Sequence, residues 1–285
     1  MTGTGLLGVA GLLGRFSDDM TRIVDQHFGS DWAENDEIIA LVSLTDVPPP
    51  TTRQLSERSG LHRRATSRLV SRLQADRLVF TRVAEVDRRA IQLTLTEAGR
   101  ERMQALERAM DVFFDDSSRL ASDVVSGLGD TSQPESALTF LRPGPLGLLE
   151  QTVSVGTELV GRLPVSAGRS RLTGRERAAL VRIASDHLVR PLDLGHSLRV
   201  GRSGVSYLVD RLCAKGLVER QPGRVSGDRR AVVLNVTDIG QGLVDGVCAA
   251  IDDARPLLRP LFIAVRDRSD RLPEPAAGHA SAGQL

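Results

Sequence analysis

The 285-residue sequence contains few residues of several types, and each shortage excludes a class of protein. Aromatic residues make up 3% of the chain, so neither aromatic stacking on bases nor an aromatic cage is expected. The two cysteines, Cys213 and Cys248, exclude a disulfide framework and form no zinc-binding pattern with the five histidines. The longest apolar run, residues 5–13, is about half as long as a bilayer span, and no basic residue precedes it as in a signal peptide. We therefore expect a cytoplasmic protein without a membrane segment.

Motifs for catalysis and for cofactors are also missing. The histidines lie far apart without the spacing of metal ligands, and no Ser/His/Asp set is grouped in the sequence. The glycine-rich stretch 5–14 lacks the GKS/T ending and the preceding strand of a phosphate-binding loop. We expect no enzymatic activity, no cofactor and no metal.

The chain contains an internal repeat. Residues 61–79 align with residues 200–218 at an offset of 139, with nine of nineteen positions identical. After a two-residue insertion, residues 87–99 align with residues 228–240, with seven of thirteen positions identical. The same offset also matches positions in the segments that precede these stretches, among them Glu37 with Glu176. One unit of about 140 residues therefore occurs twice.

The repeat predicts how the chain is divided. We expect one unit over residues 1–135 and a second over residues 136–272, because polar and proline–glycine segments between them mark a boundary. The last residues, 273–285, are rich in Pro, Ala, Gly and Ser and almost lack bulky apolar side chains, which predicts a disordered tail.

Both units have the same predicted order of elements. Leucines at i and i+4, such as Leu69 and Leu73, indicate the buried stripe of a helix, and Thr173 with Glu176 forms a capping box. Alternation of apolar and polar residues over 78–95 and 217–236 predicts two hairpins, with tips near 85–88 and 222–228. The expected helices are 5–28, 36–46, 52–59, 62–76 and 97–128 in the first unit and 145–162, 173–185, 191–198, 201–215 and 238–268 in the second. The expected fold class is mainly α with small β-hairpin wings, as two tandem winged helix-turn-helix domains with helical extensions.

Three sequence motifs occur in both units. They are the LVxRL…LV end of the fourth helix, a DRR triplet in the wing, and the junction LTLTEAG or LNVTDIG between strand and helix. In these motifs each unit resembles the MarR family of bacterial transcription regulators, and the resemblance covers residues 5–128 and 145–268. One departure is Arg77, where the family usually has the glycine that the second unit has at Gly216.

The resemblance implies a sequence-specific regulator that binds a double-stranded DNA operator and dimerises through its terminal helices. Members of the family normally carry one unit per chain, so a tandem chain is unusual. Many relatives release DNA when a small aromatic or phenolic ligand enters a cleft between the helical core and the recognition helix. The few aromatic residues predict that such a pocket is largely aliphatic here.

Helix 62–76 is the expected recognition helix of the first unit, because its N-terminal half fits a major groove and arginine often contacts guanine. We expect contacts with base edges and nearby phosphates from Arg63, Arg64, Ser67 and Arg68, with Arg72 on the DNA backbone. The equivalents in the second unit are Arg202, Ser203, Ser206 and Tyr207, with Arg211 on the DNA backbone. The alternative is a solvated helix face. The two helices differ chemically, which favours an imperfect or non-palindromic operator.

The wing residues are expected to approach a minor groove, whose narrow stretches attract arginine. The family pattern implies this role for Asp87, Arg88 and Arg89 and for Asp228, Arg229 and Arg230, and the second wing adds Arg224. The alternative is a hairpin held together by salt bridges.

The charge distribution agrees with DNA binding although the net charge is only +1. Residues 51–110 carry 13 basic and 7 acidic side chains, and residues 190–240 carry 9 and 5. By contrast, residues 1–50 carry 2 basic and 8 acidic side chains. The basic segments coincide with the predicted recognition helices and wings, where a duplex would lie.

Two units in one chain predict a monomer that forms a pseudo-dimer internally. The expected core consists of helices 5–28, 97–128, 145–162 and 238–268. One alternative is a homodimer of chains with four recognition helices. Another is a winged-helix module that binds proteins, because this fold also serves as a partner-binding scaffold.

Overall fold

The computed structural model describes residues 3–29, 35–84, 90–130, 142, 144–164, 166–167, 170–186, 189–198, 200–222 and 232–268. This part of the chain is mostly helical and contains three two-stranded antiparallel sheets, two of them at the positions of the expected wings, which confirms the expected winged-helix fold class. The first half contains α1 (Gly3–Phe28), α2 (Asn35–Ser43), α3 (Thr52–Ser59), α4 (Arg63–Ala75), β1 (Val79–Val83), β2 (Ile91–Leu95), α5 (Glu97–Asp116) and α6 (Ser118–Leu128). The second contains α7 (Gly144–Arg162), β3 (Ser166–Ala167), β4 (Ser170–Arg171), α8 (Gly174–Ser185), α9 (Pro191–Leu198), α10 (Arg202–Ala214), β5 (Val218–Pro222), β6 (Val232–Val236), α11 (Asp238–Asp253) and α12 (Arg255–Arg266).

The expected order of elements is present in both halves, but the long last helix of each half was predicted wrongly. Each is two helices, separated at Ser117 in the first half and at Ala254 in the second. In the second half Pro256 follows the break, and proline has no backbone N–H with which to continue the preceding helix. The short β3–β4 pair was not predicted, and α2 ends three residues before the expected position.

The two wings have matching strand registers. Val79 pairs with Leu95 and Val83 with Ile91 in the first, while Val218 pairs with Val236 in the second. The backbone N–H of Leu93 donates to the carbonyl of Pro50, and that of Leu234 donates to Val189 in the same way. Each hairpin is therefore anchored to the loop that precedes the short third helix of its half. The predicted wing tips lie outside the described residues.

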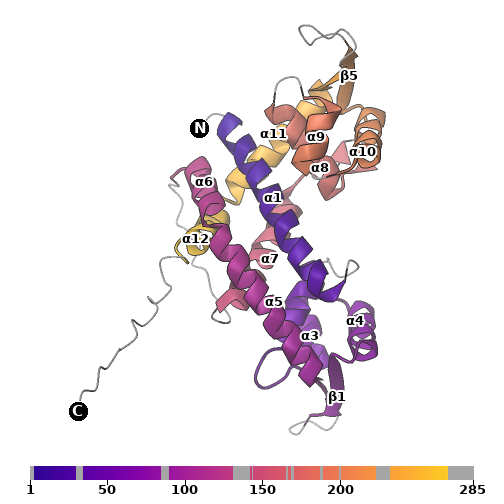
Figure 1. The fold of residues 1–285 in the computed structure, drawn as a ribbon, viewed down its shortest axis with the longest axis vertical. Helices are drawn as coiled ribbons and strands as arrows, with labels where there is room; N and C mark the ends of the chain where they lie inside the picture. The colour runs from indigo at the N-terminus through magenta and orange to yellow at the C-terminus, as the bar shows by residue number, and fades with distance from the viewer. Residues whose placement is uncertain are drawn as a thin grey trace, which may run out of the picture.

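The helical core is shared by the two halves. Helix α1 crosses the centre of the molecule between the two winged portions (Figure 1) and packs against α5 and α6 of its own half and α8 and α11 of the other. Helix α7 in turn packs against α2 and α5, and α6 packs against α12. Ring centroids of Phe16 and Phe113 are 5.0 Å apart, and those of Phe16 and Phe262 are 5.1 Å apart, so α1, α5 and α12 meet in one aromatic cluster.

The predicted boundary at residues 135 and 136 stays a prediction. The largest group of buried apolar side chains contains residues from both sides of it, including Leu106 and Leu128 on one side and Leu149 and Leu258 on the other. Among the described residues, no helix is long and apolar enough to cross a membrane.

Candidate DNA-binding surface

Helix α4 has one buried face and one exposed face. The helix begins after His62, whose Nδ1 accepts a hydrogen bond of 3.1 Å from the backbone N–H of Ala65. Thr66, Leu69, Val70 and Leu73 are buried against the rest of the first half. The predicted contact residues of the other face, Arg63, Arg64, Ser67 and Arg68, are all exposed. The structure therefore brings these four together on one accessible surface.

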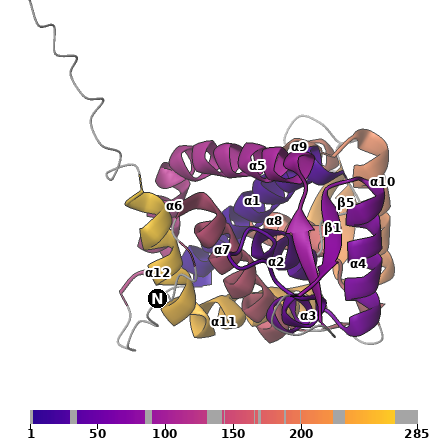
Figure 2. The same ribbon diagram turned by 90° about the horizontal axis from the view of Figure 1, so that it is seen from below.

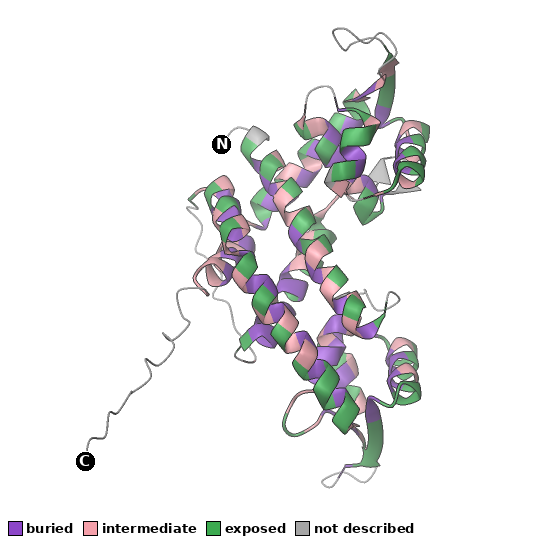
Figure 3. Ribbon diagram, viewed as in Figure 1, coloured by how far each residue is buried: buried purple, intermediate pink, exposed green. Residues whose placement is uncertain are grey.

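Helix α10 repeats this arrangement. Its buried residues are Val205, Leu208, Val209 and Leu212. Its exposed residues include the predicted contact residues Arg202, Ser203, Ser206 and Tyr207. Figure 3 shows exposed positions on both α4 and α10. The exposed face of α10 carries fewer arginines than that of α4.

The two helices lie on the same side of the molecule. Figures 1 and 2, two views at right angles, both place α4 and α10 along one edge, with the helical core behind them. The strands of each wing stand at the outer end of this edge (Figure 1). A single straight partner can therefore approach both helices from one direction.

The same ion pair occurs at equivalent positions of the two halves. Arg72 of α4 donates to Glu37 of α2 at 2.9 Å. Arg211 of α10 donates from Nε to Glu176 of α8 at 2.6 Å. The sequence repeat aligns Arg72 with Arg211 and Glu37 with Glu176, and this correspondence was the sequence signal for the contact. Only the two arginines were predicted as site residues. These arginines tie α4 to α2 and α10 to α8, and their predicted contacts with the DNA backbone stay a prediction.

Arg211 also positions the exposed Tyr207. Its Nη1 donates a hydrogen bond to the tyrosine hydroxyl at 3.0 Å, and its Cζ lies 5.5 Å from the ring centroid. The ring is thus held by a hydrogen bond and a cation–π contact while 60% of the residue stays exposed. The exposed ring of Tyr207 is therefore fixed relative to α10.

In the second ion pair, the carboxylate of Glu176 accepts hydrogen bonds from several donors. The residue is 1% exposed, and its carboxylate accepts hydrogen bonds from the backbone N–H of Thr173 at 2.7 Å and from Lys215 Nζ at 2.9 Å, besides that from Arg211. Burial alone would raise the pKa of Glu176, but the bonds from Thr173, Lys215 and Arg211 outweigh it and lower the pKa to about 2. The ionised side chain therefore ties α8 to α10 at neutral pH.

Replacing Glu176 by glutamine is expected to lower the free energy of unfolding at pH 7 by about 1–2 kcal/mol, because charge-assisted hydrogen bonds are lost. Since the folded pKa lies below the ordinary value of 4.5, the carboxylate stabilises the fold above that pH and its contribution disappears as the pH falls towards 2. Urea denaturation at pH 7 and pH 3 measures this. The difference between wild type and variant should shrink at pH 3, whereas the exposed Glu101→Gln control should change stability little at either pH. A pH-independent difference would contradict the assigned role.

The described parts of the wings carry two further polar contacts. Arg82 Nε donates to Gln92 across the first hairpin at 3.0 Å. Arg220 of β5 donates to Asp210 of α10 at 2.6 Å, and this hydrogen bond raises the pKa of Arg220. The second pair fixes the base of the wing against the recognition helix, and no sequence pattern predicted it. All the wing residues predicted to contact DNA lie outside the described residues: Asp87, Arg88, Arg89, Arg224, Asp228, Arg229 and Arg230.

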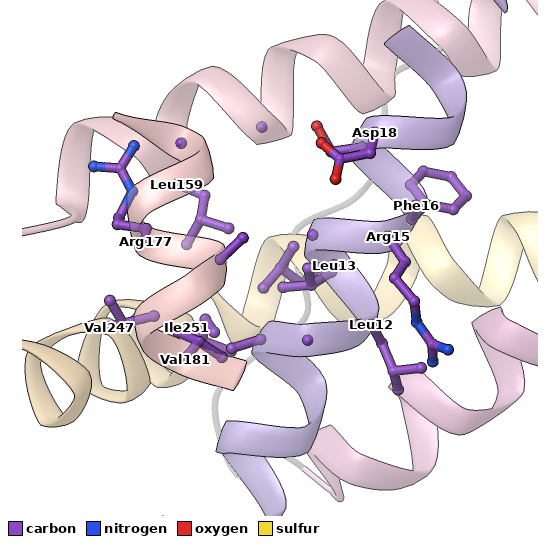
Figure 4. Close-up of a pocket in the computed structure, with 18 of the residues that line it drawn as sticks. Leu12, Leu13, Arg15, Phe16, Asp18, Leu159, Arg177, Val181, Val247 and Ile251 are labelled. Atoms are coloured by element: carbon purple, nitrogen blue, oxygen red, sulfur yellow. The ribbon is translucent and has the colours of Figure 1, made fainter. Parts of the chain in front are cut away.

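A cavity of about 670 Å³ lies between α1, α7, α8, α11 and α12 (Figure 4). Leucine, valine, alanine and glycine make up most of its lining, in agreement with the aliphatic pocket expected from the composition. A search of the described residues finds no cluster of three His, Cys, Asp or Glu side chains that could hold a metal ion.

One protein-family model matches part of the chain. No curated protein matches the chain. Residues 35–90 match the MarR family, and this segment contains α2, α3, α4 and the first strand of the wing. The terminal helices and the second half lie outside the match. The chain therefore carries a MarR family domain at residues 35–90, which supports a MarR-type DNA-binding regulator.

Proposed function

We propose that the chain is a cytoplasmic, sequence-specific regulator of transcription that binds a double-stranded DNA operator with both α4 and α10. The observation that carries this proposal is the position of the two helices on one side of the molecule, with their predicted contact residues exposed. In winged-helix regulators such a helix lies in the major groove, and two of them contact half-sites separated by one helical turn.

One chain then corresponds to a dimer of relatives that have one unit per chain. The shared core of α1, α5, α6, α7, α11 and α12 holds the two halves together, as the dimer interface does in relatives with one unit per chain. Covalent linkage raises the effective concentration of one half for the other, so no second chain is required.

The operator is proposed to be asymmetric. Arg64 and Arg68 of α4 suit guanines, with which arginine forms bidentate hydrogen bonds. Ser203 and Tyr207 stand at the equivalent positions of α10 and suit adenine–thymine pairs, through hydroxyl hydrogen bonds and apolar contact with the thymine methyl.

The regulator is also proposed to respond to a small molecule. The cavity lies where α8, which packs against α10 and bonds to it through Glu176, meets the helical core. A molecule bound there would change DNA affinity if it favoured one position of α10 over another.

Binding to DNA upstream of the chain's own coding sequence tests the proposal. Fluorescence anisotropy is measured at two salt concentrations, with a scrambled duplex as the control. We expect preference for the upstream duplex and a steep loss of affinity at higher salt, because each neutralised phosphate releases counterions. Equal affinity for both duplexes, or binding that salt leaves unchanged, would contradict sequence-specific DNA recognition and favour a protein-binding module.

A further inference from the structure

We propose that control by a small molecule is one-sided in this chain. The cavity binds one small aliphatic anion, which fixes the second winged lobe (residues 174–236) against the helical core. The first winged lobe (residues 35–95) is held to the core permanently. The regulatory meaning of this inference rests on the proposed function, but the binding site and its effect on one lobe are testable without DNA.

The buried apolar side chains of the two lobes join the helical core to different extents. Buried side chains of the first lobe, such as Leu55, Leu73 and Leu93, belong to one continuous cluster with those of the shared helices. The buried side chains of the second lobe, such as Leu194 and Leu212, form a separate cluster, which among the described residues of the core helices includes only Leu243 and Val244 of α11. Of the described residues of the second lobe, Val181 alone belongs to the central cluster. Less buried apolar surface therefore resists movement of the second lobe.

At three positions that line the cavity, α1 has smaller residues than the aligned positions of α7. At the repeat offset of 139, Ala10 of α1 corresponds to Leu149 of α7, and Gly11 corresponds to Glu150. Gly14 likewise stands where α7 has a valine. Helix α7 fills its contact with α2 with the buried Leu149 and Glu150, whereas a Cβ added at Gly11 would meet nothing within 4 Å.

No neighbouring atom of the described residues requires a glycine at these positions. A glycine inside a helix costs about 1 kcal/mol relative to alanine, which close approach of another backbone often justifies. A Cβ at Gly8, Gly11, Gly14 or Gly156 would meet open space, and all four residues line the cavity. At these four positions the lining of the cavity has no side chain.

A partly buried ion network connects the first lobe to the helical core, and the described residues of the second lobe contain no equivalent of it. Arg142 contacts Asp46 at 2.8 Å and Glu150 at 3.0 Å, and it donates to Thr45 Oγ1 at 2.6 Å. Arg58 of α3 also contacts Asp46. The repeat places Ser185 opposite Asp46 and glycine opposite Glu150, so the second lobe lacks the acidic partners of this network.

The charged side chains around the cavity favour an anion. Three arginines and two aspartates line it, and one of the aspartates, Asp186, is paired with Arg182 at 2.5 Å. Arg177 is half-buried at one edge of the cavity, beside Leu159 (Figure 4). Among the described residues no carboxylate contacts it, and burial lowers the pKa of its guanidinium. A carboxylate with a short alkyl chain would pair with Arg177 and place its chain among the aliphatic side chains.

Octanoate is the probe for the test. Isothermal titration calorimetry on the full chain should show saturable binding of one octanoate per chain, and octylamine should bind at least about tenfold more weakly because its charge repels Arg177. Arg177→Gln should reduce octanoate affinity while leaving that for octanol unchanged. No saturable binding, two sites per chain, or equal affinity for octylamine would overturn the proposed site.

Hydrogen–deuterium exchange tests the one-sided effect. Octanoate should slow exchange of the amides of α8 and α10 at least about tenfold and leave those of α2 and α4 unchanged. Gly11→Leu, which fills the cavity, should slow exchange in the same two helices without octanoate and abolish its binding. Slowing in both lobes, or in neither, would overturn the inference. DNA binding by the same samples, measured separately, shows whether the proposed function itself holds.

Discussion

Replacing Arg64 and Arg68 together by alanine is expected to weaken binding to the operator about 100- to 1,000-fold, because each arginine–guanine contact contributes about 1–3 kcal/mol. Both side chains are exposed on α4, on the side of the molecule that also carries α10. The equivalent pair in the second half, Ser203→Ala with Tyr207→Ala, is expected to reduce affinity only about tenfold, since these residues form weaker contacts with bases. Anisotropy titrations at one fixed salt concentration measure both effects.

The matched control removes the same charge from another surface. Arg108 of α5 and Arg119 of α6 are exposed and lie outside both recognition helices. Replacing both by alanine lowers the net charge equally, so a comparable loss of affinity would mean that overall charge, and not the face of α4, determines binding. We expect the control variant to bind within about threefold of wild type.

The second large effect is expected from Gly240→Ala, which should lower the free energy of unfolding by about 3 kcal/mol. A Cβ on Gly240 would overlap the backbone carbonyl oxygen of Leu217, where α11 begins against the base of the wing. Thr237 caps this helix, since its hydroxyl accepts from the backbone N–H of Gly240 at 3.1 Å and donates to the carbonyl of Gly216 at 2.6 Å. The helix start therefore cannot move away from the wing without breaking its own cap.

Gly242→Ala is the control for this prediction. A Cβ at Gly242, on the same helix, would meet nothing within 4 Å. Alanine should therefore raise the stability by up to about 1 kcal/mol through its higher helix propensity. Thermal or urea unfolding of both variants measures the difference. Equal effects of the two substitutions would show that the contact between helix and wing does not require glycine.

The repeat was the strongest source of information in the sequence. Because two copies carry the same spacing of buried leucines, capping residues and turn residues, they predicted the positions of α3, α4, α9 and α10 to within a residue or two. The Thr and Gly of the LTLTEAG and LNVTDIG junctions also predicted the start of the helix after each wing. The physical reason for this glycine appears only in three dimensions, where Gly99 and Gly240 face the backbone carbonyls of Leu78 and Leu217.

Features that depend on contact between distant segments were not predicted. The breaks at Ser117 and Ala254 let α6 and α12 pack against each other, which local periodicity does not reveal. The repeat conserves both Arg72 and Glu37. However, the sequence of a predicted recognition helix does not show that one of its arginines pairs with a carboxylate of the same chain. The cavity was not predicted, because it depends on the position of α1 against the second half and on the missing side chains of the α1 glycines.

The most direct test of a single chain with two recognition helices is the mass of its complex with one operator duplex, measured by analytical ultracentrifugation. We predict one 30.8 kDa chain per duplex, with footprinting of the same complex showing two protected segments about one helical turn apart. A complex that contains two chains, or a single protected segment, would contradict the pseudo-dimer.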